Sequence, residues 1–146
     1  MEKKILVLPK GWKRTTEKYQ LQNDQRLENL DNLICPSQET VSLFKINEDK
    51  DLGLYMFEKM LKDYSKITTN LKLLYIGKIN IKKNNISIYI IREKFSSKYL
   101  AHVLFVLENT LYALIFNIKD YKPSLKQMLE SNITLKEVIN LLEAQF

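Results

Sequence analysis

The residues best suited to nucleophilic chemistry are a single histidine, His102, and a single cysteine, Cys35. A catalytic nucleophile needs an oriented base within hydrogen-bond reach. His102 lies in an apolar run, and its neighbours Ala101 and Val103 would point to the opposite face of a strand. Cys35 precedes Pro36, has no CxxC partner, and no helix N-terminus is expected beside it to lower its pKa. We therefore predict that both are structural, with hydrogen bonds satisfying the histidine, and we assign no catalytic residue.

The densest group of potential metal ligands is the acidic cluster Glu48, Asp49 and Asp51. It lacks the regular ligand spacing, central glycine and closing glutamate of a calcium loop. One histidine and one cysteine far apart do not make a zinc site. The three glycines of the sequence fit neither a P-loop nor a dinucleotide-binding fingerprint. We predict no metal site and no cofactor, and we expect the carboxylates to cap a helix.

The composition indicates one ordinary globular domain over residues 1–146. The sequence is 45% hydrophobic and 27% charged, which argues against disorder. A lone cysteine excludes an intramolecular disulfide. The first apolar run, Ile5–Leu8, is too short for a secretory signal, and no run approaches the roughly 20 apolar residues of a membrane span. These features predict a cytoplasmic protein without a membrane span.

The formal net charge of +6 raises the question of a nucleic-acid partner. The excess is almost all lysine, whereas bidentate recognition of phosphates and bases prefers arginine. A single-stranded nucleic acid would stack on aromatic side chains beside basic ones. The strand region offers such residues: Tyr75, Tyr89, Tyr99, Tyr112 and Phe116, with Lys72, Lys78, Lys82, Lys83 and Arg92. Strands favour aromatic residues in any case, so we favour a solvated lysine surface and keep nucleic acid as the alternative.

The first half of the chain predicts two short strands and one long helix. Ile5–Leu8 is expected to be an edge strand, and Pro9–Trp12 a turn. The segment Thr15–Gln38 is polar and is interpreted as a short helix or a meandering loop. Val41–Ile46 is typical of a strand. A helix is expected over Asp51–Lys66, with one apolar stripe formed by Leu54, Phe57, Met60, Leu61 and Tyr64.

The second half predicts an antiparallel meander followed by helices. The four expected strands are Leu71–Ile81, Ile86–Phe95, Tyr99–Leu107 and Thr110–Ile118. Asn84–Asn85, Ser96–Lys98 and Glu108–Asn109 are expected to connect them, because asparagine accepts positive φ. A short helix over Leu125–Leu129 then precedes a terminal helix, for which Thr134 and Glu137 have the spacing of a capping box.

The last two expected strands are apolar at both odd and even positions, over Val103–Leu107 and Leu111–Phe116. A sheet with one wet face would alternate instead. Both faces must therefore be covered, either by helices in an α/β/α sandwich or in part by a partner on an apolar face. We favour the sandwich, which gives an α+β fold with an antiparallel β-meander sheet flanked by helices.

The apolar opening strand followed by Pro9, Gly11 and Trp12 resembles the start of many PsbP/DcrB-like domains. Those domains continue with a strand, a long helix, an antiparallel meander and a C-terminal helix ending near an aromatic residue, here Phe146. Their members are mainly non-enzymatic binding modules, including chaperones for bacterial secreted toxins. The resemblance implies an α/β/α sandwich and a protein-binding role, and it carries over no catalytic residue.

These observations favour a protein-binding module over an enzyme. A small protein without a catalytic motif is also typical of bacterial immunity proteins, so the expected partner is a toxin to be neutralised or a secreted effector to be chaperoned. A single-stranded nucleic-acid-binding module is the alternative, and an enzyme is the third possibility. The contact residues that we select are exposed positions around the meander: Lys78, Tyr89 and Arg92.

Overall fold

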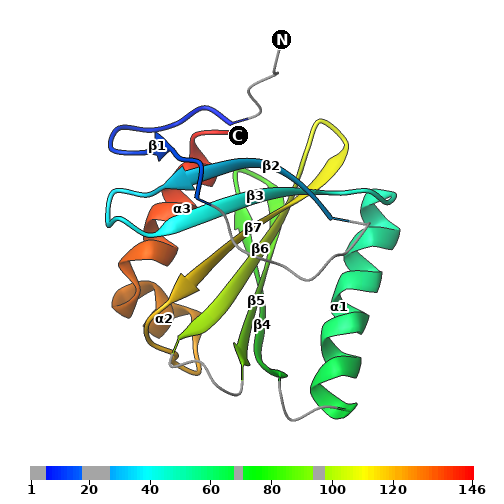
Figure 1. Ribbon diagram of the computed structural model, residues 1–146. Helices are drawn as coiled ribbons and strands as arrows, with labels where there is room; N and C mark the ends of the chain where they lie inside the picture. Colours follow the sequence, from blue (N-terminus) through cyan, green and yellow to red (C-terminus); the bar gives the residue numbers. More distant parts are fainter. Residues whose placement is uncertain (1–5, 18–26, 68–70, 94–97) are drawn as a thin grey trace.

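The computed structural model describes residues 6–17, 27–67, 71–93 and 98–146, and its described strands form one antiparallel sheet. The sheet has the order β1-β2-β3-β7-β6-β5-β4 (Figure 1). The strands are β1 (Lys13–Arg14), β2 (Leu27–Ile34), β3 (Thr40–Ile46), β4 (Leu71–Ile81), β5 (Asn84–Glu93), β6 (Tyr99–Leu107) and β7 (Thr110–Ile118). The predicted α+β meander is confirmed, since β4 to β7 pair in succession.

Helices cover both faces of the sheet. Helix α1 (Lys50–Ile67) packs on one face, which we call the α1 face. Helices α2 (Leu125–Ser131) and α3 (Ile133–Glu143) pack on the other, the α3 face (Figure 1). The expected α/β/α sandwich is therefore the observed arrangement. No helix in the described part of the chain is both long enough and apolar enough to cross a membrane.

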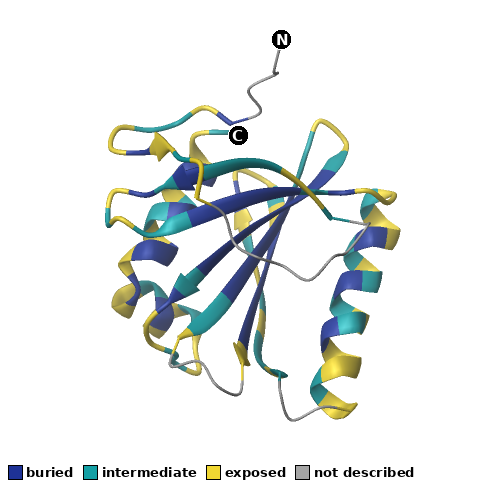
Figure 2. Cartoon of the chain, in the orientation of Figure 1, coloured by how far each residue is buried: buried dark blue, intermediate teal, exposed yellow. Residues whose placement is uncertain are grey.

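The doubly apolar strands lie in the middle of the sheet, where each face needs its own core. Leu104 and Ile115 are buried in the cluster of the α1 face together with Phe57. Phe105 and Phe116 point the other way and are buried in the cluster that includes the helices of the α3 face. Figure 2 shows the central strands buried along most of their length. Alternation along a strand thus fills two cores at once.

Two predictions for the N-terminal region are wrong. The segment Thr15–Gln38, expected to be a helix or loop, contains strand β2, which pairs with β3 and has a bulge between Asn29 and Asp31. The expected strand Ile5–Leu8 is absent over its described residues. Instead, the backbone of Val7 bonds the side-chain amide of Gln145, with Val7 N donating at 2.8 Å and Val7 O accepting at 2.7 Å. The Gln145 amide thus satisfies the backbone groups of Val7 that a neighbouring strand would otherwise bond.

The helix N-termini confirm one capping prediction and overturn another. Asp49 Oδ2 accepts from the backbone N–H groups of Asp51 and Leu52, as expected for a cap of α1. The capping box at Thr134 is wrong, because α3 begins at Ile133 and its N-cap residue makes no side-chain cap. Glu137 instead accepts from Ser37 in the turn between β2 and β3.

The turn between β4 and β5 is also displaced from its predicted position. Lys82 and Lys83 form it, with φ of 48° and 70°, whereas Asn84 and Asn85 belong to β5. Asn80 accepts from Lys83 N, and the Asn84 amide donates to two carbonyls of the turn, so asparagines brace it from both sides. The turn at Glu108–Asn109 is where it was predicted. Most of the predicted Ser96–Lys98 connection lies outside the described residues.

Candidate protein-binding surface

An open groove runs along one side of α1, beside the stripe that the helix buries. The buried residues are Gly53, Phe57 and Leu61, one turn apart. The described residues that line the groove are Met56, Lys59, Met60, Asp63, Tyr64 and Ile67, around a volume of about 360 Å³. We call these six residues the α1 groove. Its apolar members follow a helical spacing of about four residues, which places them on one side of the helix.

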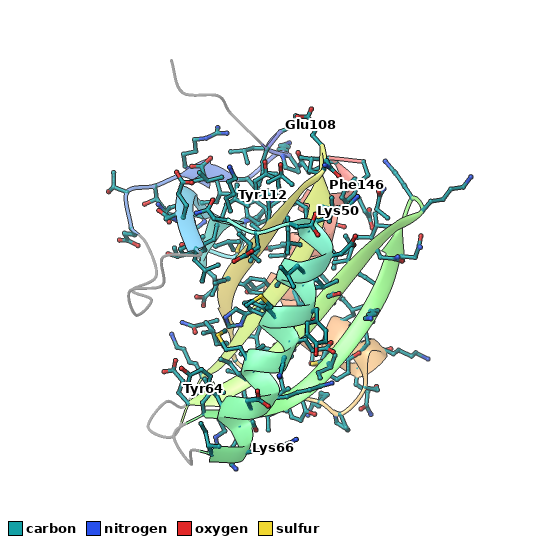
Figure 3. All side chains as sticks on the ribbon, turned by 90° about the vertical axis from the view of Figure 1, so that its right-hand side faces the viewer. Lys50, Tyr64, Lys66, Glu108, Tyr112 and Phe146 are labelled. Carbon is teal, nitrogen blue, oxygen red and sulfur yellow. The ribbon has the colours of Figure 1, made fainter. Side chains whose placement is uncertain are left out.

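The C-terminal end of this groove displays apolar side chains to solvent. Tyr64 is 51% exposed and Ile67 is 78% exposed. Figure 3 shows Tyr64 and Lys66 near the end of α1, far from Lys50 at its start. Met60 and Tyr64 were predicted to lie in the buried stripe, which is wrong for Tyr64. A signal that could have indicated a surface groove is Met56, an apolar residue off that stripe, together with Ile67 at its edge, beyond the predicted end of the helix.

The structure separates the three residues selected as partner contacts. Lys78 on β4 and Arg92 on β5 are exposed, as predicted. Tyr89 is wrong as a contact, because it is fully buried on the α1 face. Its hydroxyl donates to Glu58 Oε1 at 3.2 Å, and its ring lies 5.5 Å from that of Phe57. Burial, followed by the negative charge of Glu58, raises the pKa of Tyr89 well above its ordinary value.

Of the five aromatic residues proposed for nucleic-acid stacking, three belong to the core, whereas Tyr75 and Tyr99 are half-buried. Tyr89, Tyr112 and Phe116 are buried in the core. The phenol of Tyr75 folds over Gly77, where a side-chain carbon would collide with it. Stacking needs rings that face solvent beside basic groups. The basic residues of β4 and β5 therefore have fewer exposed aromatic neighbours than this alternative expected, and Tyr99 pairs with Arg92 across β5 and β6.

His102 lies under α1, packed against Phe57. Its ring centroid is 5.4 Å from that of Phe57, and burial lowers its pKa to about 4. Within the described residues, its Nδ1 atom has no hydrogen-bond partner, so the prediction of a fully satisfied histidine is wrong. A neutral imidazole sealed from solvent has no path to a substrate. The structural role predicted for it remains the better interpretation.

Cys35 takes part in a partly buried hydrogen-bond network that joins the turn between β2 and β3 to α3. Its Sγ atom lies 3.1 Å from Ser37 Oγ, which donates to Glu137 Oε2 at 2.9 Å. Burial raises the pKa of the Cys35 thiol, and the hydrogen bond and charge of Glu137 raise it further. A reactive cysteine needs the opposite shift. In the described ranges, no three His, Cys, Asp or Glu side chains gather closely enough to hold a metal ion.

Comparison with known proteins gives a structural likeness only. No family model and no curated protein matches the sequence. The chain resembles a PsbP structure in outline. The solution structure of cyanobacterial PsbP (CyanoP) from Synechocystis sp. PCC 6803 superposes with a TM-score of 0.47 and 10% identity, covering 95% of this chain and 83% of that one. No residue role is transferred at this level of similarity.

Proposed function

We propose that this chain is a non-enzymatic protein-binding module, either an immunity protein that neutralises a cognate bacterial toxin or a chaperone for a secreted effector. The observation that supports this proposal is the α1 groove. It places Met56, Met60, Tyr64 and Ile67 together on one side of an outer helix. Met60 also packs against the core of the α1 face, whereas Tyr64 and Ile67 are exposed. Contiguous exposed apolar residues mark interaction sites more often than isolated ones do.

The chemistry of the groove suits an apolar segment of a partner protein. Methionine side chains adapt their shape to different partners because they are unbranched and polarisable. Tyrosine is enriched among the few residues that contribute most of the binding energy at interfaces. Lys59 and Asp63 lie in the same groove and would set the register of the partner through charge. An amphipathic helix or an apolar loop is the expected occupant.

The helices that cover both faces of the sheet limit where a chaperone could bind its client. The sequence left open an apolar sheet face that clasps a helix of the client. In the described part of the sheet, the central apolar residues of both faces are buried beneath helices. A client would therefore bind at the outer side of α1, which is also where a toxin would be occluded.

The test is co-purification of the tagged protein from its native host. The wild-type protein is expected to recover a stoichiometric partner, and the double variant Tyr64→Ala, Ile67→Ala to lose it. Each of the two substitutions is expected to weaken binding about 30-fold, which corresponds to the loss of an interface side chain that contributes roughly 2 kcal/mol. Ile133→Ala is the matched control, since Ile133 is 62% exposed on α3, on the opposite layer.

Two results would contradict the proposal. One is purification of the wild-type protein alone from cells that express the partner gene. The other is equal loss of the partner in the Ile133→Ala control. Once a partner is recovered, its expression with and without this protein separates the two roles. Rescue of growth indicates immunity, whereas solubility or export of the partner indicates a chaperone.

A further inference from the structure

Strand β4 forms a long margin of the sheet, at the end opposite the short strand β1. It has eleven residues and, among the strands that the structure describes, it pairs with β5 alone. The other margin, β1, has two residues. An edge strand presents a row of N–H and C=O groups that can pair with another chain, and proteins usually shorten, charge or cover such edges. The hairpin of β4 and β5 extends beyond α1 toward the upper right of Figure 3.

The register identifies which backbone groups of β4 point outward. Lys82 and Lys83 form a two-residue turn with positive φ, so the flanking residues Ile81 and Asn84 are a hydrogen-bonded pair. Hydrogen-bonded and non-bonded pairs then alternate along an antiparallel ladder. It follows that Ile79 and Gly77 bond β5, whereas the N–H and C=O groups of the alternate residues face outward. Those residues are Ile76, Lys78 and Asn80.

The far end of the same edge is already closed by the protein. Leu73 N donates to Ser65 Oγ of α1 at 3.0 Å, and Tyr121 Oη donates to Leu74 O at 2.9 Å. The bulge between Leu73 and Tyr75 separates this closed part from the rest. Among the described residues, no hydrogen bond reaches the outward backbone groups from 76 to 80. The three outward residues also have exposed side chains, and Ile76 is 37% exposed.

The charge around this edge is one-sided. From Leu71 to Glu93 the hairpin carries five cations and one carboxylate: Lys72, Lys78, Lys82, Lys83 and Arg92 against Glu93. Lys78 and Lys83 lie beside the open part, whereas Lys72 and Lys82 donate to backbone carbonyls of Ser65 and of Glu143 and Phe146. Pairing β4 with its own copy would place these lysines close to one another, and like charges on adjacent strands are unfavourable. A lysine in the middle of an edge strand is a common guard against such self-association. A partner strand with carboxylates opposite Lys78 would instead be attracted to this edge, because opposite charges on adjacent strands are favourable.

We propose that the outer edge of β4 from Ile76 to Asn80 binds an extended, acidic segment of a partner protein as an additional strand of the sheet. Backbone hydrogen bonds to Ile76, Lys78 and Asn80 provide the affinity, and carboxylates beside Lys78 and Lys83 select the segment. This inference rests on the proposed protein-binding function and names a second surface for it.

The test uses the full-length protein and a synthetic octapeptide of alternating valine and glutamate. Amide NMR signals of the ¹⁵N-labelled protein are followed during titration. We expect saturable shifts centred on Ile76, Lys78 and Asn80, and no such shifts with a valine–lysine octapeptide. Lys78→Pro removes an outward N–H while leaving the β5 ladder intact, so binding should weaken at least tenfold. Lys78→Gln keeps the N–H and should weaken it about two- to fivefold.

Lys78→Glu is the second charge variant, and amide dispersion of each variant verifies that it is folded. Preference for the valine–lysine peptide by Lys78→Glu supports the inference. It is overturned by equal binding of both peptides to the wild type, by shifts confined to the α1 groove, or by no shifts at millimolar peptide. Dimerisation at the edge, seen by ultracentrifugation and abolished in Lys78→Pro, also overturns it in favour of a second copy. Peptide binding without a co-purified partner would refute the proposed function alone.

Discussion

Replacement of Tyr89 tests whether this residue belongs to the core or to a binding surface. Its side chain is fully buried on the α1 face, against Phe57 and Glu58. Truncating a buried aromatic residue to alanine costs about 3–5 kcal/mol of unfolding free energy. At about 3 °C per kcal/mol for a chain of this size, Tyr89→Ala should lower Tm by roughly 12 °C.

Tyr89→Phe isolates the hydroxyl group. It removes the hydrogen bond to Glu58 Oε1 and keeps the ring. Glu58 is partly exposed and is also paired with Lys62. Water and that lysine can therefore still bind the carboxylate when the tyrosine hydroxyl is removed. We therefore expect a loss of about 1 kcal/mol, the usual value for one hydrogen bond, or roughly 3 °C in Tm. In a double-mutant cycle with Glu58→Ala, most of this loss should appear as coupling between the two residues.

The assay is urea unfolding monitored by circular dichroism, with thermal unfolding as a second measurement. Tyr55→Ala is the matched control, because Tyr55 is 64% exposed on α1, the helix that covers Tyr89. The free energy of unfolding of this variant should change by less than about 0.5 kcal/mol. A Tyr89→Ala loss below about 1 kcal/mol, or one equal to that of Tyr55→Ala, would refute the assignment of Tyr89 to the core. It would return Tyr89 to the list of surface contacts.

Three further predictions concern the buried polar groups. Because burial lowers the pKa of His102 to about 4, the unfolded state binds a proton that the folded state refuses between pH 6.5 and 4. Stability should therefore fall by about 3 kcal/mol across that window, and His102→Leu should remove this component in urea unfolding. Glu137→Ala breaks two bonds from Ser37 and should cost about 2–3 kcal/mol, measured as a Tm decrease of roughly 6–9 °C. Cys35 is fully buried with a raised pKa, so a thiol reagent should label it at least about 100-fold more slowly in the native protein than in urea.

Each of these predictions has its own control or contrary outcome. Identical pH profiles of wild type and His102→Leu would show that the histidine is not the titrating group. Glu130→Ala serves beside Glu137→Ala, since Glu130 is exposed on α2 and should change stability by less than about 0.5 kcal/mol. Rapid labelling of native Cys35 would contradict its burial. It would also indicate that the Cys35 thiol, beside Ser37 and Glu137, is able to react.

The meander was predictable because its signals are local. β-branched and aromatic residues in runs of nine to eleven, with a turn at Glu108–Asn109, were sufficient to predict β4, β6 and β7 with their observed bounds. Strand β2 was not predictable in this way. Its sequence is polar and its bulge interrupts alternation, so it is a strand because β3 offers an edge to pair with. Tertiary pairing overrides local propensity there.

The fate of Glu137 shows the same limit for hydrogen bonds. Its spacing from Thr134 fits a capping box, and that pattern is defined by four neighbouring residues. In the structure, its carboxylate bonds Ser37, which is 100 residues away in the chain. Val7 and Gln145 are separated by 138 residues and are likewise brought together by the tertiary fold. Patterns within one element cannot reveal such partners.

The three selected contact residues show how far the exposure of a side chain can be predicted from the sequence of a strand. Alternation assigns side chains to two faces, but it does not say which face is covered, so Tyr89 and Lys78 were both taken as exposed. Both lie on the α1 face, and Ile76, next to Lys78, pairs with Tyr89 across the two strands. Helix α1 covers Tyr89 through Glu58 and Phe57 and leaves Lys78 at the margin. The margin exists because the crossover from β3 through α1 sends β4 to the far side of the sheet, while β7 returns to pair with β3. The open edge of β4 is therefore a product of topology, and no local pattern in residues 71–81 marks it.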